Sequence, residues 1–145
     1  MTAAPVFLVD SCVLIDLLGD SPWAPWAAAA LGEGSGVTAI NAVIIAEVGA
    51  AYRRFEDFRE AVPEAVFPDL PFPAEAAFLA GQVHRAYRQS GGQRERTLPD
   101  FLIGAHAAVA GMSLITRDPR RYRRHFPRLA LIAPDTHFPQ LAPFA

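Results

Sequence analysis

The segment Val6-Phe-Leu-Val-Asp10 decides the fold of this chain of 145 residues. Its short apolar, partly β-branched run ends at an acidic residue, a pattern typical of a buried strand. The residues that follow, 11–18, have the apolar pattern of a helix, and Gly19 ends it. A buried strand that leads directly into a helix is the repeating unit of a parallel α/β sheet.

The same alternation of short apolar strands and helices continues along the chain. We expect further strands at 37–40, 112–116 and 129–133. Helices are expected at 22–31, from an Asn41 cap to about Ala61, at 73–89, at 101–110 and as a basic turn after Asp118. The proline-rich segment 62–73 and the polar residues 93–96 are predicted loops. With no repeat and no linker in the pattern, residues 1–145 are expected to form a single α/β domain with a mainly parallel sheet.

Composition excludes several classes of protein. With 52% hydrophobic residues and a mean hydropathy of +0.18, the chain can bury a core. No apolar run reaches the roughly 18–20 residues that span a bilayer, and the first ten residues lack the basic start of a signal peptide. A single cysteine, Cys12, excludes an internal disulfide framework and a multi-cysteine zinc site. We therefore expect a cytoplasmic protein without a membrane segment.

Three acidic residues stand where helices are expected to begin. Asp10 and Asp118 each follow a predicted strand, and Pro119 suits the first position of a helix. Asp100 completes Thr97-x-x-Asp100, which has the spacing of a capping box. Because such caps are common and contribute about 1 kcal/mol each, none of these residues identifies a catalytic site by itself.

Glu47 does not fit that explanation. It is the only charged residue in the stretch 43–50, and the nearest arginine, Arg53, lies six positions further on. An unpaired carboxylate on an apolar helix face is costly unless it is protonated or bound. The alternative is that Glu47 lies on a polar face of its helix and is solvated.

The four acids become informative together. Ligands of a parallel α/β sheet bind beyond the carboxyl ends of its strands, where Asp10 and Asp118 are expected and where the helix of Asp100 can begin. Carboxylates gathered there repel one another unless cations occupy the site. Oxygen ligands suit Mg²⁺ or Mn²⁺, whereas the histidines have no ligand spacing and His106 is expected in the core. The pattern predicts a two-metal, phosphodiester-cleaving site at Asp10, Glu47, Asp100 and Asp118.

In their order and spacing, these motifs resemble the PIN domain, and within it the VapC-type toxins of toxin–antitoxin pairs. The similarity extends over essentially the whole chain and rests on Val9-Asp10-Ser-Cys-Val-Leu-Ile-Asp-Leu-Leu18, Asn41-x5-Glu47, Leu98-Pro-Asp100-x2-Ile-x-Ala-x-Ala107 and Leu114-Ile-Thr116-Arg-Asp118. The resemblance implies a PIN-like three-layer α/β/α fold with a short, mainly parallel central sheet. It also implies a Mg²⁺- or Mn²⁺-dependent endoribonuclease, a homodimer, and a VapB-like antitoxin as the partner.

The resemblance also implies roles for individual residues. Asp10 and Asp100 would be the main metal ligands, and Glu47 and Asp118 would complete the acidic pocket. Ser11 and Thr116 match the family's small hydroxyl positions beside the acids. The segment after Asp118 departs from the toxin pattern with a proline and a run of arginines, which bears on substrate preference.

RNA can approach an acidic pocket only if cations line its rim. The net charge is −2 and all 13 basic side chains are arginines, a bias that also fits a GC-rich coding sequence. The predicted phosphate-binding residues are Arg94, Arg96, Arg117, Arg120, Arg121 and Arg124. For any one of them, a solvated basic face is the simpler explanation.

Of four alternative functions, the sequence excludes two and leaves two open. A haloacid-type phosphatase would need Asp-x-Asp where this chain has Asp10-Ser-Cys12, and a phosphoacceptor receiver domain would need a lysine, so neither fits. A PIN-fold protein that binds RNA or a partner without cutting stays possible from the sequence. So does a nuclease that acts on DNA.

Overall fold

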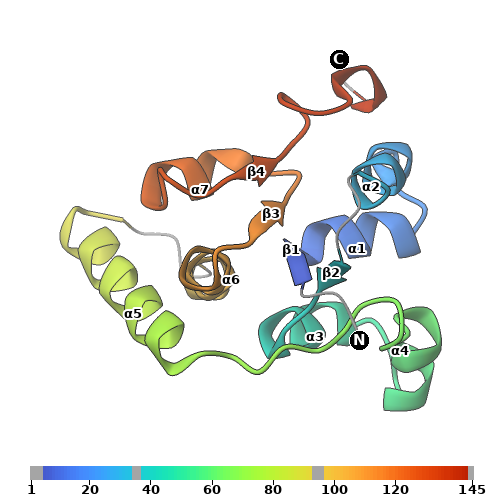
Figure 1. Ribbon diagram of the computed structural model, residues 1–145, viewed down its shortest axis with the longest axis horizontal. Helices are drawn as coiled ribbons and strands as arrows, with labels where there is room; N and C mark the ends of the chain where they lie inside the picture. The colour runs from blue at the N-terminus through green and yellow to red at the C-terminus, as the bar shows by residue number, and fades with distance from the viewer. Residues whose placement is uncertain (1–4, 34–36, 93–96, 144–145) are drawn as a thin grey trace.

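The computed structural model describes residues 5–33, 37–92 and 97–143 and arranges their elements in three layers (Figure 1). The predicted loop at 93–96, with Arg94 and Arg96, lies outside these ranges. The elements follow in the order β1 (Pro5–Val9), α1 (Ser11–Leu18), α2 (Ala24–Leu31), β2 (Val37–Ala39), α3 (Ala42–Gly49), α4 (Phe55–Ala61), α5 (Ala74–Gln89), α6 (Leu98–Ala110), β3 (Ser113–Ile115), α7 (Pro119–His125), β4 (Leu131–Ile132) and the 3₁₀ turn η1 (Pro139–Leu141).

The four described strands form one sheet in the order β2-β1-β3-β4, with every neighbouring pair parallel. Leu8 on β1 pairs with Ala39 on one side and with Leu114 on the other, so β1 and β3 are the central strands. The predicted α/β fold with a parallel sheet is confirmed. Because all strands run the same way, the residues that follow them meet at one edge of the sheet.

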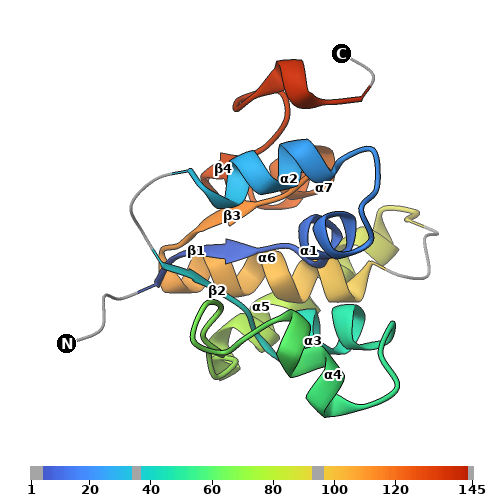
Figure 2. The same cartoon turned by 90° about the vertical axis from the view of Figure 1, so that its right-hand side faces the viewer.

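Helices cover both faces of the sheet, as Figures 1 and 2 show from two sides. Helices α1 and α2 cover one face, and α6 covers the other with α5 outside it. Trp26 of α2 and Phe101 of α6 are among the largest fully buried side chains, one from each helical layer. Among the described helices, none combines the length and the apolar character that crossing a membrane requires.

Asn41 joins the end of β2 to the core. Its side-chain oxygen accepts a hydrogen bond of 3.0 Å from the backbone N–H of Ile44, which confirms the predicted cap of α3. Its amide nitrogen lies 2.9 Å from Nδ1 of His106 on α6, and both side chains are buried. Burial lowers the pKa of His106, so the neutral ring accepts this bond as part of the predicted core.

The long helix predicted from Asn41 to Ala61 is wrong. Helix α3 ends at Gly49, and α4 begins only at Phe55. An uninterrupted helix of this length would extend about 30 Å, carrying its far end away from the sheet. The break instead turns α4 back, so that Phe58 and Val62 are buried in the core. Gly49 is the only glycine or proline in this stretch of the sequence. The position of the break is therefore explained by the packing of α4 against the core.

The capping box predicted at Thr97-x-x-Asp100 is also absent from the structure. Thr97 takes the N-cap position of α6, but its side chain forms no cap hydrogen bond. Its hydroxyl is buried without a hydrogen-bond partner among the described residues. Asp100 therefore stands in the first turn of α6 with no partner in a capping box, and its carboxylate is available for other contacts.

Asn41→Ala should destabilise the fold by about 2 kcal/mol, because it removes both the cap and the amide donor to buried His106. Urea denaturation at neutral pH measures this loss. Asn41→Ser keeps a short cap acceptor but cannot reach His106, so it should recover about half of the difference. Equal stability of Asn41→Ala and wild type would contradict the structural role assigned to Asn41.

Candidate active site

Asp10 lies at the centre of the site, where β1 ends. Its backbone N–H donates a 2.8 Å hydrogen bond to the carbonyl of Ile115, the last residue of β3. The side chain is buried, with only 4% of the residue exposed. Its Oδ2 accepts hydrogen bonds from the hydroxyl of Thr116, at 2.8 Å, and from that of Tyr122, at 3.0 Å. One carboxylate oxygen thus links β1, the loop after β3 and helix α7.

The alternative of ordinary helix caps does not account for Asp10 and Asp118. Both residues take the N-cap position, of α1 and α7 respectively, yet neither side chain makes a cap hydrogen bond. The Asp10 carboxylate is held by hydroxyl donors from other elements instead. Its position at the start of α1 therefore does not explain why a carboxylate is needed there.

Burial raises the pKa of Asp10 above its ordinary value, and the nearby charge of Glu47 raises it further. The hydrogen bonds from Thr116 and Tyr122 lower the pKa, but each has a smaller effect than burial, and the net shift is upward. Burial and the charge of Asp10 raise the pKa of Tyr122 in turn, so this phenol keeps its proton and stays a donor. The position consequently favours either a proton or a bound cation.

Glu47 is tied to the same place through Ser11. The Ser11 hydroxyl donates a 2.8 Å hydrogen bond to Glu47 Oε1, across from α1 to α3. Because Ser11 follows Asp10 directly, this bond brings the half-buried Glu47 close to the Asp10 carboxylate, in agreement with the effect of its charge. The alternative of a fully solvated Glu47 does not describe this structure.

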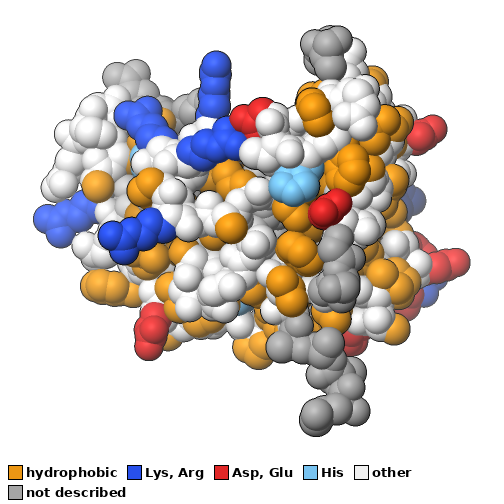
Figure 3. Space-filling view, turned by 45° about the horizontal axis from the view of Figure 1, so that its top comes forward, with side chains coloured by type: hydrophobic (Ala, Val, Ile, Leu, Met, Phe, Trp, Pro, Cys, Tyr) orange, Lys and Arg blue, Asp and Glu red, His pale blue; other side chains and the backbone are white. Residues whose placement is uncertain are grey.

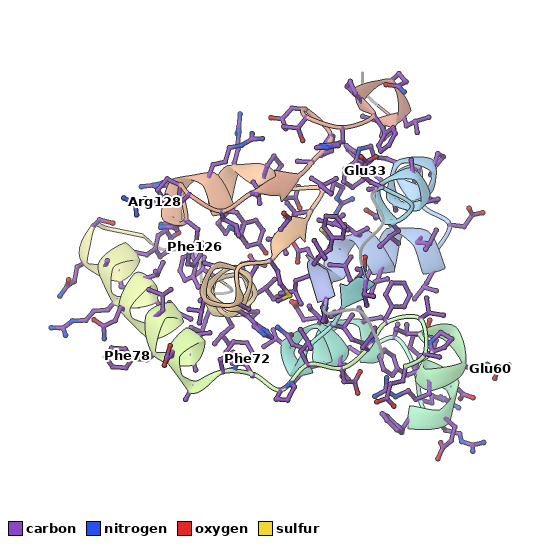
Figure 4. All side chains as sticks on the ribbon, viewed as in Figure 1. Glu33, Glu60, Phe72, Phe78, Phe126 and Arg128 are labelled. Atoms are coloured by element: carbon purple, nitrogen blue, oxygen red, sulfur yellow. The ribbon has the colours of Figure 1, made fainter. Side chains whose placement is uncertain are left out.

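Helix α7 connects Asp10 to Asp100 through two adjacent residues. Tyr122 is buried and donates to Asp10, while the guanidinium of Arg121 forms an ion pair with Asp100 on α6. The helices approach closely because Gly104 has no side chain. A Cβ atom at Gly104 would lie 2.6 Å from the ring of Phe126 and 3.0 Å from that of Tyr122. The labelled Phe126 lies between α7 and α6 in Figure 4.

Asp118 lies further out. Its side chain is 74% exposed, and the Arg117 guanidinium is 3.9 Å from its carboxylate. Only its backbone joins the network, because its N–H donates a 3.1 Å bond to the Thr116 hydroxyl that in turn donates to Asp10. The structure thus links Glu47 to Asp10 through Ser11 and Asp100 to Asp10 through α7, and it leaves the Asp118 carboxylate at the rim.

Two residues of this network were missed from the sequence. Tyr122 is the single aromatic residue within the arginine run and lies three positions after Pro119. An aromatic residue among charged ones on a short helix indicates a side chain that faces the core. Asp16 was also missed, although it is the only charged residue in α1. An isolated charge in an apolar helix is the signal that singled out Glu47. Asp16 is buried, accepts a 3.0 Å bond from Ser21 and pairs with Arg117 at 3.2 Å. This pair anchors the loop between Thr116 and Asp118 against α1.

The predicted phosphate-binding arginines therefore fall into distinct groups. Arg117 is held by Asp16 and also lies over the ring of Trp23, 5.6 Å from its centre, and Arg121 is held by Asp100. Arg120 and Arg124 are exposed on α7. Figure 3 shows basic side chains gathered over the part of the surface formed by α7 and α5. A basic surface thus adjoins the acidic site.

The ligand chemistry of this site fits a hard divalent cation. Carboxylate and hydroxyl oxygens from β1, α3, α6 and the loop after β3 supply the donors, as Mg²⁺ and Mn²⁺ prefer. Across residues 5–33, 37–92 and 97–143, however, no three acidic, His or Cys side chains stand close enough to hold an ion as they are. Asp100 is instead neutralised by the chain's own cation, Arg121.

Comparison with known proteins agrees with this architecture. The sequence model of the PIN domain matches residues 7–127. A chain of the VapBC2 complex from Rickettsia felis, bound to a DNA fragment from its promoter, is similar in structure, with 16% identity, a TM-score of 0.65 and coverage of 88% of this chain and 97% of that one. A chain of a toxin–antitoxin complex from Klebsiella pneumoniae shows 24% identity, a TM-score of 0.62 and coverage of 88% and 96%.

A chain of DNA-bound VapBC from Salmonella typhimurium shows 17% identity, a TM-score of 0.64 and coverage of 90% of this chain and 98% of that one. At these identities the likeness establishes the fold alone. The search of curated proteins gave no match.

Asp10→Asn should stabilise the protein at neutral pH in metal-free buffer. Because the folded-state pKa of Asp10 is raised, the wild type loses stability as pH rises from the unfolded value, about 3.9, through the folded pKa. The asparagine variant has no such loss. Urea denaturation between pH 3 and 8 should show a difference that is absent at the acidic end and grows with pH.

Asp135→Asn supplies a control with the opposite sign. The bonds from Arg123 lower the pKa of Asp135, so its stabilising effect is present above the unfolded pKa and is lost on acidification. This variant should be less stable than wild type at neutral pH, with the difference vanishing at low pH. A pH-independent difference for Asp10→Asn would contradict the buried, charged environment described for Asp10.

Proposed function

The chain belongs to the PIN-domain family, and on that premise we propose that it is a divalent-metal-dependent endoribonuclease, the toxin of a toxin–antitoxin pair. PIN domains are generally nucleases that depend on divalent metal ions. The observation that carries the proposal is the network of hydrogen bonds and ion pairs around Asp10. Ser11 ties Glu47 to it, and the adjacent residues Tyr122 and Arg121 tie it to Asp100.

Asp10 and Asp100 would be the main metal ligands, and Glu47 and Asp118 would complete the acidic site. A bound divalent cation would supply the charge that activates the attacking water and stabilises the phosphate as it is cleaved. Thr116 and Tyr122 hold Oδ2 of Asp10 and so set the orientation of its carboxylate. Ser11 orients Glu47 in the same way. The buried hydroxyl donors limit the freedom of the acids before any ion binds.

RNA is the proposed substrate, and the exposed arginines of α7 support it. Arg120 and Arg124 lie on the helix that also reaches Asp10 and Asp100 through Tyr122 and Arg121, so a bound backbone phosphate could contact the arginines near the acids. The similar solved chains come from complexes described as VapBC or toxin–antitoxin. They support a VapB-like antitoxin as partner of this chain. A homodimer, which the family resemblance implies, and a cytoplasmic location are part of the same proposal.

Asp10→Asn and Asp100→Asn should each lower RNA cleavage by about 100-fold or more, because each removes a charged ligand. The assay follows a mixed pool of RNA with Mg²⁺ or Mn²⁺, with EDTA, and with the purified wild-type protein beside the variants. Asp135→Asn is the matched control, since this exposed carboxylate also follows a strand of the sheet and pairs with α7. It should stay within about twofold of wild type.

The outcomes separate the candidate functions. Metal-dependent cutting that both site variants lose, with EDTA abolishing it, supports the proposed nuclease. Equal cutting by wild type and Asp10→Asn would rule out the carboxylate mechanism. RNA binding without any cutting would favour a PIN-fold binding protein, and cleavage of a DNA pool in place of RNA would favour a DNA-directed nuclease.

A further inference from the structure

Arg121 differs from the other arginines of α7. Arg120, Arg123 and Arg124 are exposed, and Arg123 is engaged at the surface by Asp135. Arg121 instead turns inward beside buried Tyr122 and pairs with Asp100. Its positive charge also acts on the Tyr122 phenol, where it lowers the pKa against the larger effect of burial. The chain therefore places a cation of its own on Asp100, inside the acidic site.

The pair between Arg121 and Asp100 is accessible and can be broken. The side chain of Arg121 is 30% exposed and that of Asp100 is 20% exposed, so water reaches both partners. Ion pairs with this much solvent contact are weak compared with buried ones, which lose much more when a partner leaves. A divalent cation that binds the same carboxylate repels the guanidinium strongly at such close range. Arg121 and a metal ion therefore compete for Asp100.

A displaced Arg121 has a natural second partner. The planar guanidinium fits a phosphate with the same two-pronged geometry with which it fits a carboxylate. It is carried on the helix that presents Arg120 and Arg124 to solvent, so a released side chain joins the existing basic surface. The same residue can thus neutralise Asp100 in the metal-free protein and contact the backbone of RNA in the loaded one.

We propose that Arg121 is a displaceable counter-cation: it neutralises Asp100 until a divalent cation takes that carboxylate, and it then binds an RNA phosphate. This inference rests on the proposed function and adds a coupling to it. A phosphate that draws Arg121 away makes Asp100 available, so RNA raises the affinity for metal. By linkage, metal raises the affinity for RNA by the same factor.

Mn²⁺ binding tests the first half without any cleavage assay. Arg121→Gln should bind Mn²⁺ about three- to fivefold more tightly than wild type, measured by calorimetry or by electron paramagnetic resonance. Arg124→Gln removes the same charge from the same helix but leaves Asp100 paired, so it should stay within about 1.5-fold at physiological salt. Arg121→Lys keeps the charge and should remain near wild type. Circular dichroism and thermal denaturation check that each variant is folded.

RNA binding tests the second half. Fluorescence anisotropy with a short RNA in Ca²⁺, and again in EDTA, should show that metal strengthens RNA binding to wild type by a larger factor than to Arg121→Gln. A gel run after each titration shows whether the RNA is intact. An equal metal effect in both proteins would overturn the phosphate role of Arg121.

The remaining outcomes are distinct. Equal tightening of Mn²⁺ binding by Arg121→Gln and Arg124→Gln, or no tightening by either, would overturn the competition while leaving the nuclease proposal standing. Tighter Mn²⁺ binding by Arg121→Gln than by both wild type and Arg124→Gln would support the competition. Absence of Mn²⁺ binding from wild type and from every variant would overturn both this inference and the proposed function.

Discussion

The site depends on burying one carboxylate at the junction of β1, β3 and α7. Ionised Asp10 is unfavourable there because burial and Glu47 both oppose its charge. The fold compensates with two hydroxyl donors on one oxygen, from Thr116 and Tyr122. Each donor comes from a different segment, so the same bonds that stabilise the carboxylate also hold those segments in place. The hydrogen bonds that offset the cost of burying this charge therefore also connect segments that are distant in the sequence.

Much of this arrangement could be predicted from the sequence, since its strongest signals are local. The apolar run before Asp10, Gly19 at the end of α1 and the Asn41 cap at the start of α3 are signals that the structure confirms. Glu47 was found because it is the only charge in its apolar stretch, whereas Asp10, Asp100 and Asp118 were found at the starts of predicted helices. The break between α3 and α4 was not predictable in this way, because it serves the burial of Phe58 in a core assembled from distant residues.

Charge pairing was the least predictable feature. The sequence groups Arg117 and Arg121 with their neighbours as one basic run, but the structure pairs them with Asp16 and Asp100, which are far away along the chain. Such partners depend on which way each helical residue faces, and a short helix with arginines on every side gives no periodic signal. The number of positive charges in a segment therefore overstates how many are free to meet a ligand.

The close packing at Gly104 has a consequence for how this position varies among related sequences. Gly104 has no chemical group to contribute, yet its missing side chain is what allows Tyr122 to come close enough to α6 while reaching Asp10. Natural variation at this position should therefore be restricted as tightly as at an acidic residue of the site. A glycine that attracts no attention in a single sequence would then be recognised among many relatives. Selection at this position would preserve the absence of a side chain, whereas at the acids it preserves a reactive group.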